Sequence, residues 1–288
     1  MIIAVSVLAG LGLIAGFGLA LAARFFAVET DPRQEKVLDA LPGANCGGCG
    51  FAGCSDFAAA VVKGLAPPNG CPVGGMETAL KIAEIMGMSA DASSHVAKVA
   101  LVLCQGTNDV APVKFRYNGT ATCASAAQLA EGHKLCSYGC LGFGDCQRAC
   151  PFGAIEITEG GVARVIRERC TGCGNCVEAC PKNLIQLVPV TASVHILCSN
   201  KDKGAAARKA CQVACIACRK CQKTAGEERI EMDGFLARIK YDNPPDDPAL
   251  AGECPTGAIV ALRPDGTVLS KEEVKKEEAA AASGGGER

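Results

Sequence analysis

A run of four cysteines followed by proline, with the spacing C-x2-C-x2-C-x3-C-P, occupies residues 170–181. Three thiolates on one tight loop can reach three corners of an iron–sulfur cube, and in this pattern the fourth cysteine ligates a neighbouring cluster. The run therefore predicts a second cluster beside the first. Zinc is the weaker interpretation, because zinc sites usually show two C-x2-C pairs and not triplets that each end in Cys-Pro.

The second cluster has cysteines of its own, which lie at residues 136–150 and also end in Cys-Pro. Exchange of the fourth ligands between the two runs predicts a pair of [4Fe–4S] clusters. We expect the first cluster to be held by Cys136, Cys140, Cys146 and Cys180, and the second by Cys150, Cys170, Cys173 and Cys176.

The composition agrees with metal binding in a reducing compartment. The chain has 20 cysteines in 288 residues. A secreted disulfide-rich protein would be shorter and would lack C-x2-C-x2-C runs. The formal net charge of −1 gives no indication of nucleic-acid binding.

The N-terminal segment has the pattern of a membrane anchor. Residues 2–23 carry no charge, and a helix needs about 20 apolar residues to span a bilayer. A signal peptide would have a basic start and a shorter apolar core. Because Arg24 and further basic residues follow the segment, we expect a single-pass protein of the cell (inner) membrane with its clusters on the cytoplasmic side. Gly12 and Gly16 form a G-x3-G pattern that suits packing against other transmembrane helices.

A further group of cysteines follows in residues 41–72, with the spacing C-x2-C-x4-C-x16-C. Glycines between these cysteines let the backbone approach a cluster closely. The next residues show a helical pattern of apolar positions, so we expect a small α-helical domain with a third [4Fe–4S] cluster. Zinc is excluded less firmly here than in the paired runs. The expected ligands are Cys46, Cys49, Cys54 and Cys71.

The order of these parts resembles the B subunit of the Rnf electron-transport complex. An apolar N-terminal segment, the sequence LPGANCGGCGFAGC and a ferredoxin-type pair of runs ending CPKNLI carry the resemblance, which covers about residues 1–263. The resemblance implies a membrane complex that passes electrons between reduced soluble ferredoxin and NAD, coupled to translocation of sodium ions or protons. It also implies other membrane subunits as partners. The spacing of the cysteines by itself indicates a carrier of several clusters.

The C-terminal part repeats the pattern of the middle of the chain. A triplet at residues 215–221 and a later Cys-Pro at residue 254 match the paired runs, but Ala225, Pro244, Asp247 and Leu250 stand where four further ligands are expected. These four positions belong to one cluster. We therefore expect this cluster to be absent and only the other cluster of the pair to remain, bound by Cys215, Cys218, Cys221 and Cys254.

Four cysteines remain after these assignments, two in each repeat. In each repeat one of them ends an apolar run and the other adjoins an alanine-rich stretch. Ordinary buried thiols are the simpler interpretation, since cysteine is often buried. The matched positions favour a possible fifth [4Fe–4S] cluster bound by Cys104, Cys123, Cys198 and Cys211.

These patterns predict an α+β protein with one N-terminal transmembrane helix, a small α-helical [4Fe–4S] domain and tandem ferredoxin-like modules. The expected parts are an anchor at residues 1–28, the small domain at 29–90, a two-cluster repeat at 91–190, a one-cluster repeat at 191–265 and a disordered tail at 266–288.

The expected function is that of a membrane-anchored electron-transfer subunit that connects ferredoxin with the other subunits of an Rnf-type complex. The alternatives are a membrane-anchored polyferredoxin that serves another redox complex and a structural zinc protein. No G-x-G-x-x-G motif opens a helix after a strand, so we expect no NAD site in this chain, and no flavin site is evident. Residues 198–224 carry seven basic residues and one acidic residue. This excess could attract an acidic ferredoxin or could offset the charge of the thiolates.

Overall fold

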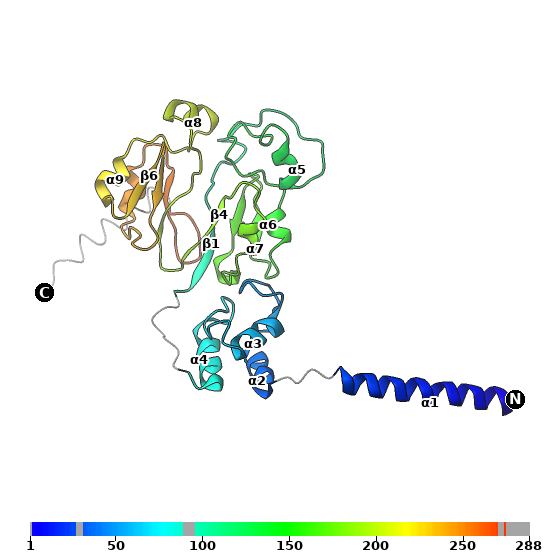
Figure 1. Ribbon diagram of the computed structural model, residues 1–288. Coiled ribbons are helices and arrows are strands. Elements are labelled where there is room, and N and C mark those ends of the chain that lie inside the picture. The colour runs from blue at the N-terminus through cyan, green and yellow to red at the C-terminus, as the bar shows by residue number, and fades with distance from the viewer. Residues whose placement is uncertain (1, 27–30, 89–95, 270–273, 275–288) are drawn as a thin grey trace.

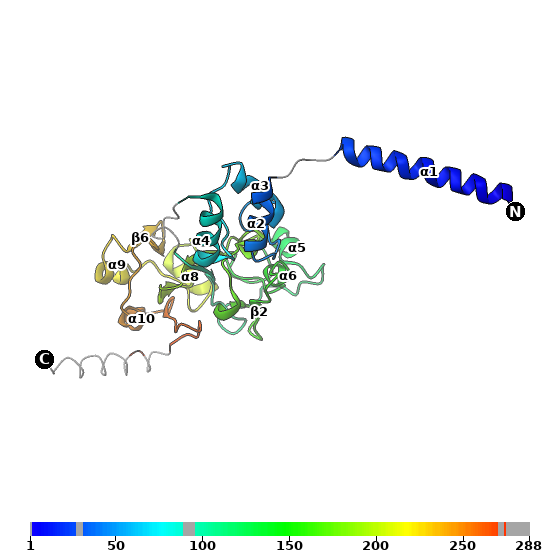
Figure 2. The same cartoon turned by 90° about the horizontal axis from the view of Figure 1, so that it is seen from below.

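The computed structural model describes residues 2–26, 31–88, 96–269 and 274. An N-terminal helix is followed by a small helical domain and by two units that contain the strands (Figure 1). The two strand-containing units lie side by side, and the helical domain lies against one end of the first unit (Figures 1 and 2).

The N-terminal segment requires a correction. Residues Ile2–Phe25 form the helix α1, which stands apart from the other elements in both views (Figures 1 and 2). A bilayer crossing takes about 20 apolar residues in one helix. Among the residues that the structure describes, no helix has the length and the apolar character for such a crossing. The predicted transmembrane helix is therefore wrong, and the single-pass topology that depends on it loses its basis.

The helical domain packs three short helices around one apolar core. Asp31 caps the first helix, since its carboxylate accepts a hydrogen bond of 2.9 Å from the Arg33 N–H. Val37, Phe57 and Ile82 come one from each helix and are at most 1% exposed. The helices are α2 (Pro32–Ala40), α3 (Cys54–Val62) and α4 (Gly75–Met86).

The first strand-containing unit contains a long antiparallel strand pair and a short hairpin. In the long pair, side chains of one strand alternate between two cores: Ala100 and Val102 face the core around the paired cysteine runs, whereas Val99 and Leu101 face the second unit. Burial on both faces explains why this strand reads as a continuous apolar run. The pairs are β1 (Lys98–Val102) with β4 (Ile185–Pro189), and β2 (Ile155–Ile157) with β3 (Ala163–Val165). The helices are α5 (Cys123–Gln128), α6 (Asp145–Arg148), α7 (Asn175–Glu178) and the 3-10 helix Arg167–Arg169.

The second strand-containing unit has the same arrangement of strands as the first. One antiparallel pair joins the two ends of the unit, and a hairpin lies between its strands in the sequence. Leu197 and Val260 of this unit pack against Val99 and Val188 of the first unit, so the long strand pairs of the two units meet at a shared apolar interface. The elements are β5 (Val194–Ile196) with β8 (Ile259–Ala261), β6 (Ile230–Asp233) with β7 (Leu236–Ile239), α8 (Gly204–Ala210), α9 (Lys220–Ala225) and α10 (Ala249–Glu253).

Apolar side chains occupy the region of the second unit where the sequence lacks four cluster ligands. Leu250 is 3% exposed and belongs to the same core as Ile230, and Ala225 packs against that core. Hydrophobic packing thus occupies a region that a cluster with its four thiolates would otherwise fill.

The C-terminal tail is ordered at its start. The Leu269 N–H donates to the Ala261 carbonyl at 2.9 Å, and the Leu269 side chain is 8% exposed. Leu269 thus packs against β8, within the stretch for which the sequence predicts a disordered tail. The rest of the predicted tail, apart from Val274, lies outside the described residues.

Candidate metal centres

Cysteine side chains converge on four hollows in the described part of the chain. Each hollow is lined by four cysteines. Four thiols around each hollow fit a four-iron cluster with one thiolate for each iron. The sets are Cys46, Cys49, Cys54 and Cys71; Cys150, Cys170, Cys173 and Cys176; Cys215, Cys218, Cys221 and Cys254; and Cys123, Cys140, Cys146 and Cys180.

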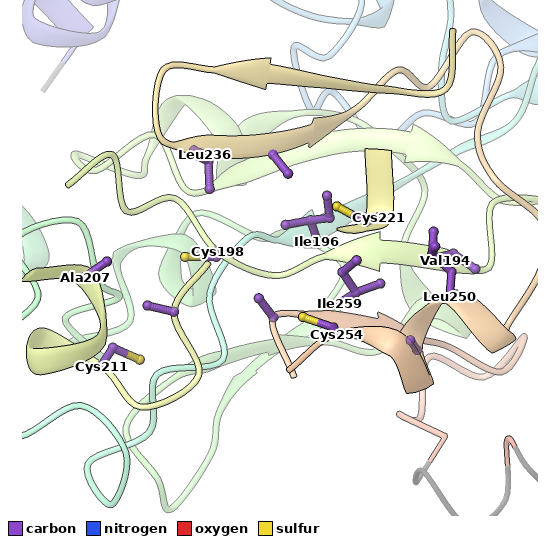
Figure 3. Close-up of a cluster of buried hydrophobic side chains, with 14 of the residues drawn as sticks. Val194, Ile196, Cys198, Ala207, Cys211, Cys221, Leu236, Leu250, Cys254 and Ile259 are labelled. Atoms are coloured by element: carbon purple, nitrogen blue, oxygen red, sulfur yellow. The ribbon is translucent and has the colours of Figure 1, made fainter. Parts of the chain in front are cut away.

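The first three sets are the groups that the sequence spacing predicts. They include the exchange of the fourth ligand, since Cys150 of the first run lies with the three cysteines of residues 170–176. In the second unit, Cys221 and Cys254 lie around Ile196 and Ile259 (Figure 3). Distant parts of the sequence therefore contribute the fourth cysteine in each strand-containing unit.

The fourth set differs from the expectation, because Cys123 takes the place of Cys136. The side chain of Asp145 explains this placement: its carboxylate accepts hydrogen bonds of 2.9 Å each from the Cys123 and Ala124 N–H groups. Asp145 directly precedes Cys146, so these bonds hold the start of α5 against the start of α6, which carries Cys146. The sequence spacing favoured Cys136 only because that residue is nearer in the chain.

The fifth set expected from the sequence is not brought together as a group, since Cys123 lies in the hollow with Cys146. Cys136 instead lies beside Cys198. Asn200 joins these two, because its side-chain amide donates to Cys136 Sγ and its backbone N–H donates to Cys198 Sγ, both at 3.5 Å.

Backbone N–H groups point at the sulfurs of the first-unit and helical-domain sites. The Ala154 N–H donates to Cys150 Sγ at 3.3 Å, and the Leu184 N–H donates to Cys180 Sγ at 3.4 Å, so the two Cys-Pro segments use equivalent donors four residues on. The Gly74 N–H donates to Cys71 Sγ at 3.4 Å. Hydrogen bonds of this kind stabilise thiolates and tune the reduction potential of iron–sulfur clusters.

Burial and crowding make these thiols poor acids in the absence of metal. Burial, together with the other cysteines of each hollow, raises the pKa of Cys146 and Cys176 to about 12. The same causes raise the pKa of Cys221 to about 11. Because metal ligands must be deprotonated, metal binding at these hollows displaces thiol protons.

The helical domain contacts the first unit next to a candidate site. The side-chain amide of Asn175 donates to the Cys46 carbonyl at 3.0 Å. Gly48 lies so close to Cys173 that a Cβ at position 48 would be 2.6 Å from the Cys173 carbonyl oxygen. The absence of a side chain at Gly48 therefore permits the cysteine loops of two domains to touch.

Two charged residues at the sites were not singled out from the sequence. Asp145 positions Cys123, as described above. Lys134 is 1% exposed, and its ammonium group donates to the Gly106 carbonyl at 2.8 Å and to the Gly161 carbonyl at 3.1 Å. The sequence feature that could have identified them is that each residue lies within two positions of a cysteine.

Two protein families match parts of the chain. Residues 41–73 match the family described as "Putative Fe-S cluster", and residues 136–184 match the "4Fe-4S dicluster domain". Together with the hollows, these matches show that the chain binds [4Fe–4S] clusters. The second match begins at Cys136, in agreement with the sequence spacing, whereas the hollow contains Cys123. The hydrogen bonds of Asp145 account for the position of Cys123.

Relatives from bacteria and archaea cover most of the chain. The B subunit of the Na(+)-translocating ferredoxin:NAD(+) oxidoreductase complex of Acetobacterium woodii is 47% identical over 84% of this chain and 72% of its own length. The B subunit of the ion-translocating oxidoreductase complex of Methanosarcina acetivorans is 40% identical over 88% of this chain and 96% of its own. The B subunit of the proton-translocating ferredoxin:NAD(+) oxidoreductase complex of Clostridium ljungdahlii is 40% identical over 88% of this chain and 89% of its own length. The chain thus belongs to the family of electron-transfer B subunits of the ion-translocating (Rnf) oxidoreductase complexes.

Proposed function

We propose that this chain transfers electrons between a reduced ferredoxin and the other subunits of an ion-translocating ferredoxin:NAD oxidoreductase complex. The observation that carries the proposal is the set of four hollows, each lined by four cysteines. A [4Fe–4S] cluster, when bound, supplies a site that gains and loses single electrons at a potential set by its surroundings. The residues of the chain hold, shield and order these sites.

The cysteine groups follow one another through the molecule, which supports a role in electron transfer over storage of metal. Cys46 of the helical domain lies against Asn175, next to Cys176. Cys146 and Cys176 lie in the neighbouring helices α6 and α7 of the first unit (Figure 1). The ligand sets proposed for these groups are the four sets of the hollows, with Cys123 in place of Cys136.

The second unit has the surface that best suits an external electron donor. Cys218 is exposed, in contrast to the buried Cys146 and Cys176. Arg219 and Lys220 follow Cys218 and also line its hollow. A positive surface steers a negatively charged partner and raises its association rate, and salt weakens this effect. We therefore propose that an acidic ferredoxin docks beside this group.

Part of the basic excess in residues 198–224 is balanced within the chain. Lys201 forms an ion pair of 2.8 Å with Asp233. Arg208 and Lys209 are exposed at the end of α8. The docking surface therefore consists of the positive charges around Cys218 and on α8, and Lys201 contributes less to it.

The relatives differ in the ion that their names contain, whereas each is the B subunit of an oxidoreductase complex. Electron transfer is the role compatible with all of them. Ion translocation takes place across a membrane, so we propose that the chain is associated with a membrane through its partner subunits. The NAD-reducing site then belongs to another member of the complex.

Anaerobic purification of the chain with its partners tests this function. Iron and sulfide analysis together with low-temperature electron paramagnetic resonance (EPR) should show [4Fe–4S] clusters, and flavin and further subunits should co-purify. Zinc in place of iron would contradict the proposal. Iron without flavin and without membrane subunits would favour a polyferredoxin that serves another enzyme.

Charge reversal tests the docking surface. Arg208→Glu with Lys209→Glu should slow stopped-flow reduction of the holoprotein by ferredoxin and flatten the salt dependence of the rate. Lys63→Glu, an exposed reversal in the helical domain, is the matched control. Equal rates for the double variant and the control at every ionic strength would place the docking site elsewhere.

A further inference from the structure

Four cysteines lie outside the four hollows, and they come together where the two strand-containing units meet. Cys104 follows β1 of the first unit, and Cys198 follows β5 of the second unit. Cys136 and Cys211 come from loops of the first and second unit respectively. Cys198 and Cys211 lie on the side of α8, near Ala207 and away from Cys221 and Cys254 (Figure 3).

The contacts between these cysteines run through Gly106 and Asn200. A Cβ built on Gly106 would lie 3.5 Å from Cys211 Sγ and 3.6 Å from Cys104 Sγ, so both sulfurs face one small volume. Asn200 is 1% exposed and donates hydrogen bonds to Cys136 Sγ and Cys198 Sγ at 3.5 Å. Each unit thus supplies two of the four thiols.

The sulfurs of this group receive the same kind of hydrogen bond as those of the first-unit and helical-domain hollows. Cys104 Sγ accepts from the Gly106 and Cys140 N–H groups, both at 3.4 Å. Cys198 Sγ accepts from the Cys215 N–H at 3.3 Å in addition to the Asn200 N–H. Neutral thiols are weak acceptors, whereas an anionic acceptor strengthens a hydrogen bond. Two N–H donors are thus directed at each of two sulfurs, Cys104 Sγ and Cys198 Sγ.

A buried lysine lies beside this group. The Lys134 side chain is 1% exposed, and among the described residues no carboxylate forms an ion pair with it. Lysine is almost never fully buried unless it is paired. The Lys134 side-chain nitrogen donates to the Gly106 carbonyl at 2.8 Å, and Gly106 lies next to Cys104 Sγ and Cys211 Sγ.

We propose that Cys104, Cys136, Cys198 and Cys211 bind a fifth [4Fe–4S] cluster. A preassembled [4Fe–4S] cluster held by the thiolates of a carrier supplies the inorganic part without a change of oxidation state. As four iron–thiolate bonds to these cysteines form, the four bonds to the carrier break, and the protons released by the four thiols pass to the departing carrier thiolates. Asn200 orients two of its ligands.

The position of the group indicates its role, which rests on the proposed electron-transfer function. The Cys140 N–H contacts Cys104, and the Cys215 N–H contacts Cys198. Cys140 and Cys215 line the hollows of the first and the second unit. The group therefore lies between the sites of the two units and joins them into one series.

Iron and sulfide analysis of the anaerobically reconstituted full chain tests the proposal. Five clusters give about 20 iron atoms per chain and four clusters give about 16. The wild-type chain should contain about 20, and Cys198→Ser should contain about 16 with the other EPR signals retained. Gln212→Ala, an exposed change next to Cys211, is the matched control and should keep all the iron.

A wild-type count near 16 would overturn the fifth site and leave the proposed function intact, whereas zinc in place of iron would overturn both. The wild-type count needs no variant, so poor folding of Cys198→Ser does not affect it. A second comparison separates the ligand sets: Cys123→Ser and Cys136→Ser should abolish different EPR signals. Loss of the same signal in both variants would contradict the assignment of Cys136 to the fifth site.

Discussion

The contact between the helical domain and the first unit leads to a quantitative prediction for Gly48→Ala. The added methyl group would lie 2.6 Å from the Cys173 carbonyl oxygen and 3.0 Å from Cys173 Cα. Both are backbone atoms on a cysteine loop, so they cannot move aside as the end of a flexible side chain can. Overpacking of this kind costs about 1–3 kcal/mol.

That free energy should appear as weaker docking of the helical domain. A cost of about 1–3 kcal/mol corresponds to an increase of about 5- to 150-fold in the population of the undocked state. Amide hydrogen exchange of the holoprotein, followed by mass spectrometry of peptides around residues 44–50 and 170–176, measures this population. We expect both peptides to exchange faster in Gly48→Ala.

Two further variants calibrate the measurement. Gly252→Ala adds the same methyl group where no atom lies within 4 Å, so its exchange should match the wild type. Asn175→Ala removes the hydrogen bond to the Cys46 carbonyl and should have a smaller effect, about 1 kcal/mol. Iron analysis of each variant confirms that clusters are retained. Unchanged exchange in Gly48→Ala would show that the two loops do not meet as described.

Three other predictions concern single side chains. Asp145→Ala removes the two acceptors that hold Cys123, a loss of about 1–3 kcal/mol, so one cluster should be lost first during timed exposure to a chelator; a release rate equal to wild type would contradict this. Cys254→Ser should remove one EPR signal and about four iron atoms per chain, and an unchanged count would refute its role as a ligand. Burial, with a smaller effect of Arg167, lowers the pKa of His195 to about 4 from 6.5. The unfolded imidazole therefore binds a proton as the pH falls from about 6.5 to 4 while the folded one does not, and stability should decrease by up to about 3 kcal/mol in this window. Urea titrations at several pH values should show a smaller decrease for His195→Gln.

The sequence alone indicates the groups of cysteines whose members are close in the chain. A triplet such as Cys170, Cys173 and Cys176 shares one loop, so its spacing already limits the positions of three sulfurs. The exchange of Cys150 and Cys180 between the two runs can also be predicted, because each Cys-Pro segment turns away from its own triplet. The structure places these cysteines in the same groups.

The tertiary structure decides the groups whose members are far apart in the chain. Cys123 and Cys136 both precede Cys140, and the spacing favours the nearer one, but the carboxylate of Asp145 holds Cys123 at the hollow. Cys136 then faces Asn200 of the second unit, a contact that depends on how the two units pack. No local pattern encodes this contact, because it arises from apolar burial that brings Val99 of β1 against Leu197 and Val260, which lie far from it in the sequence.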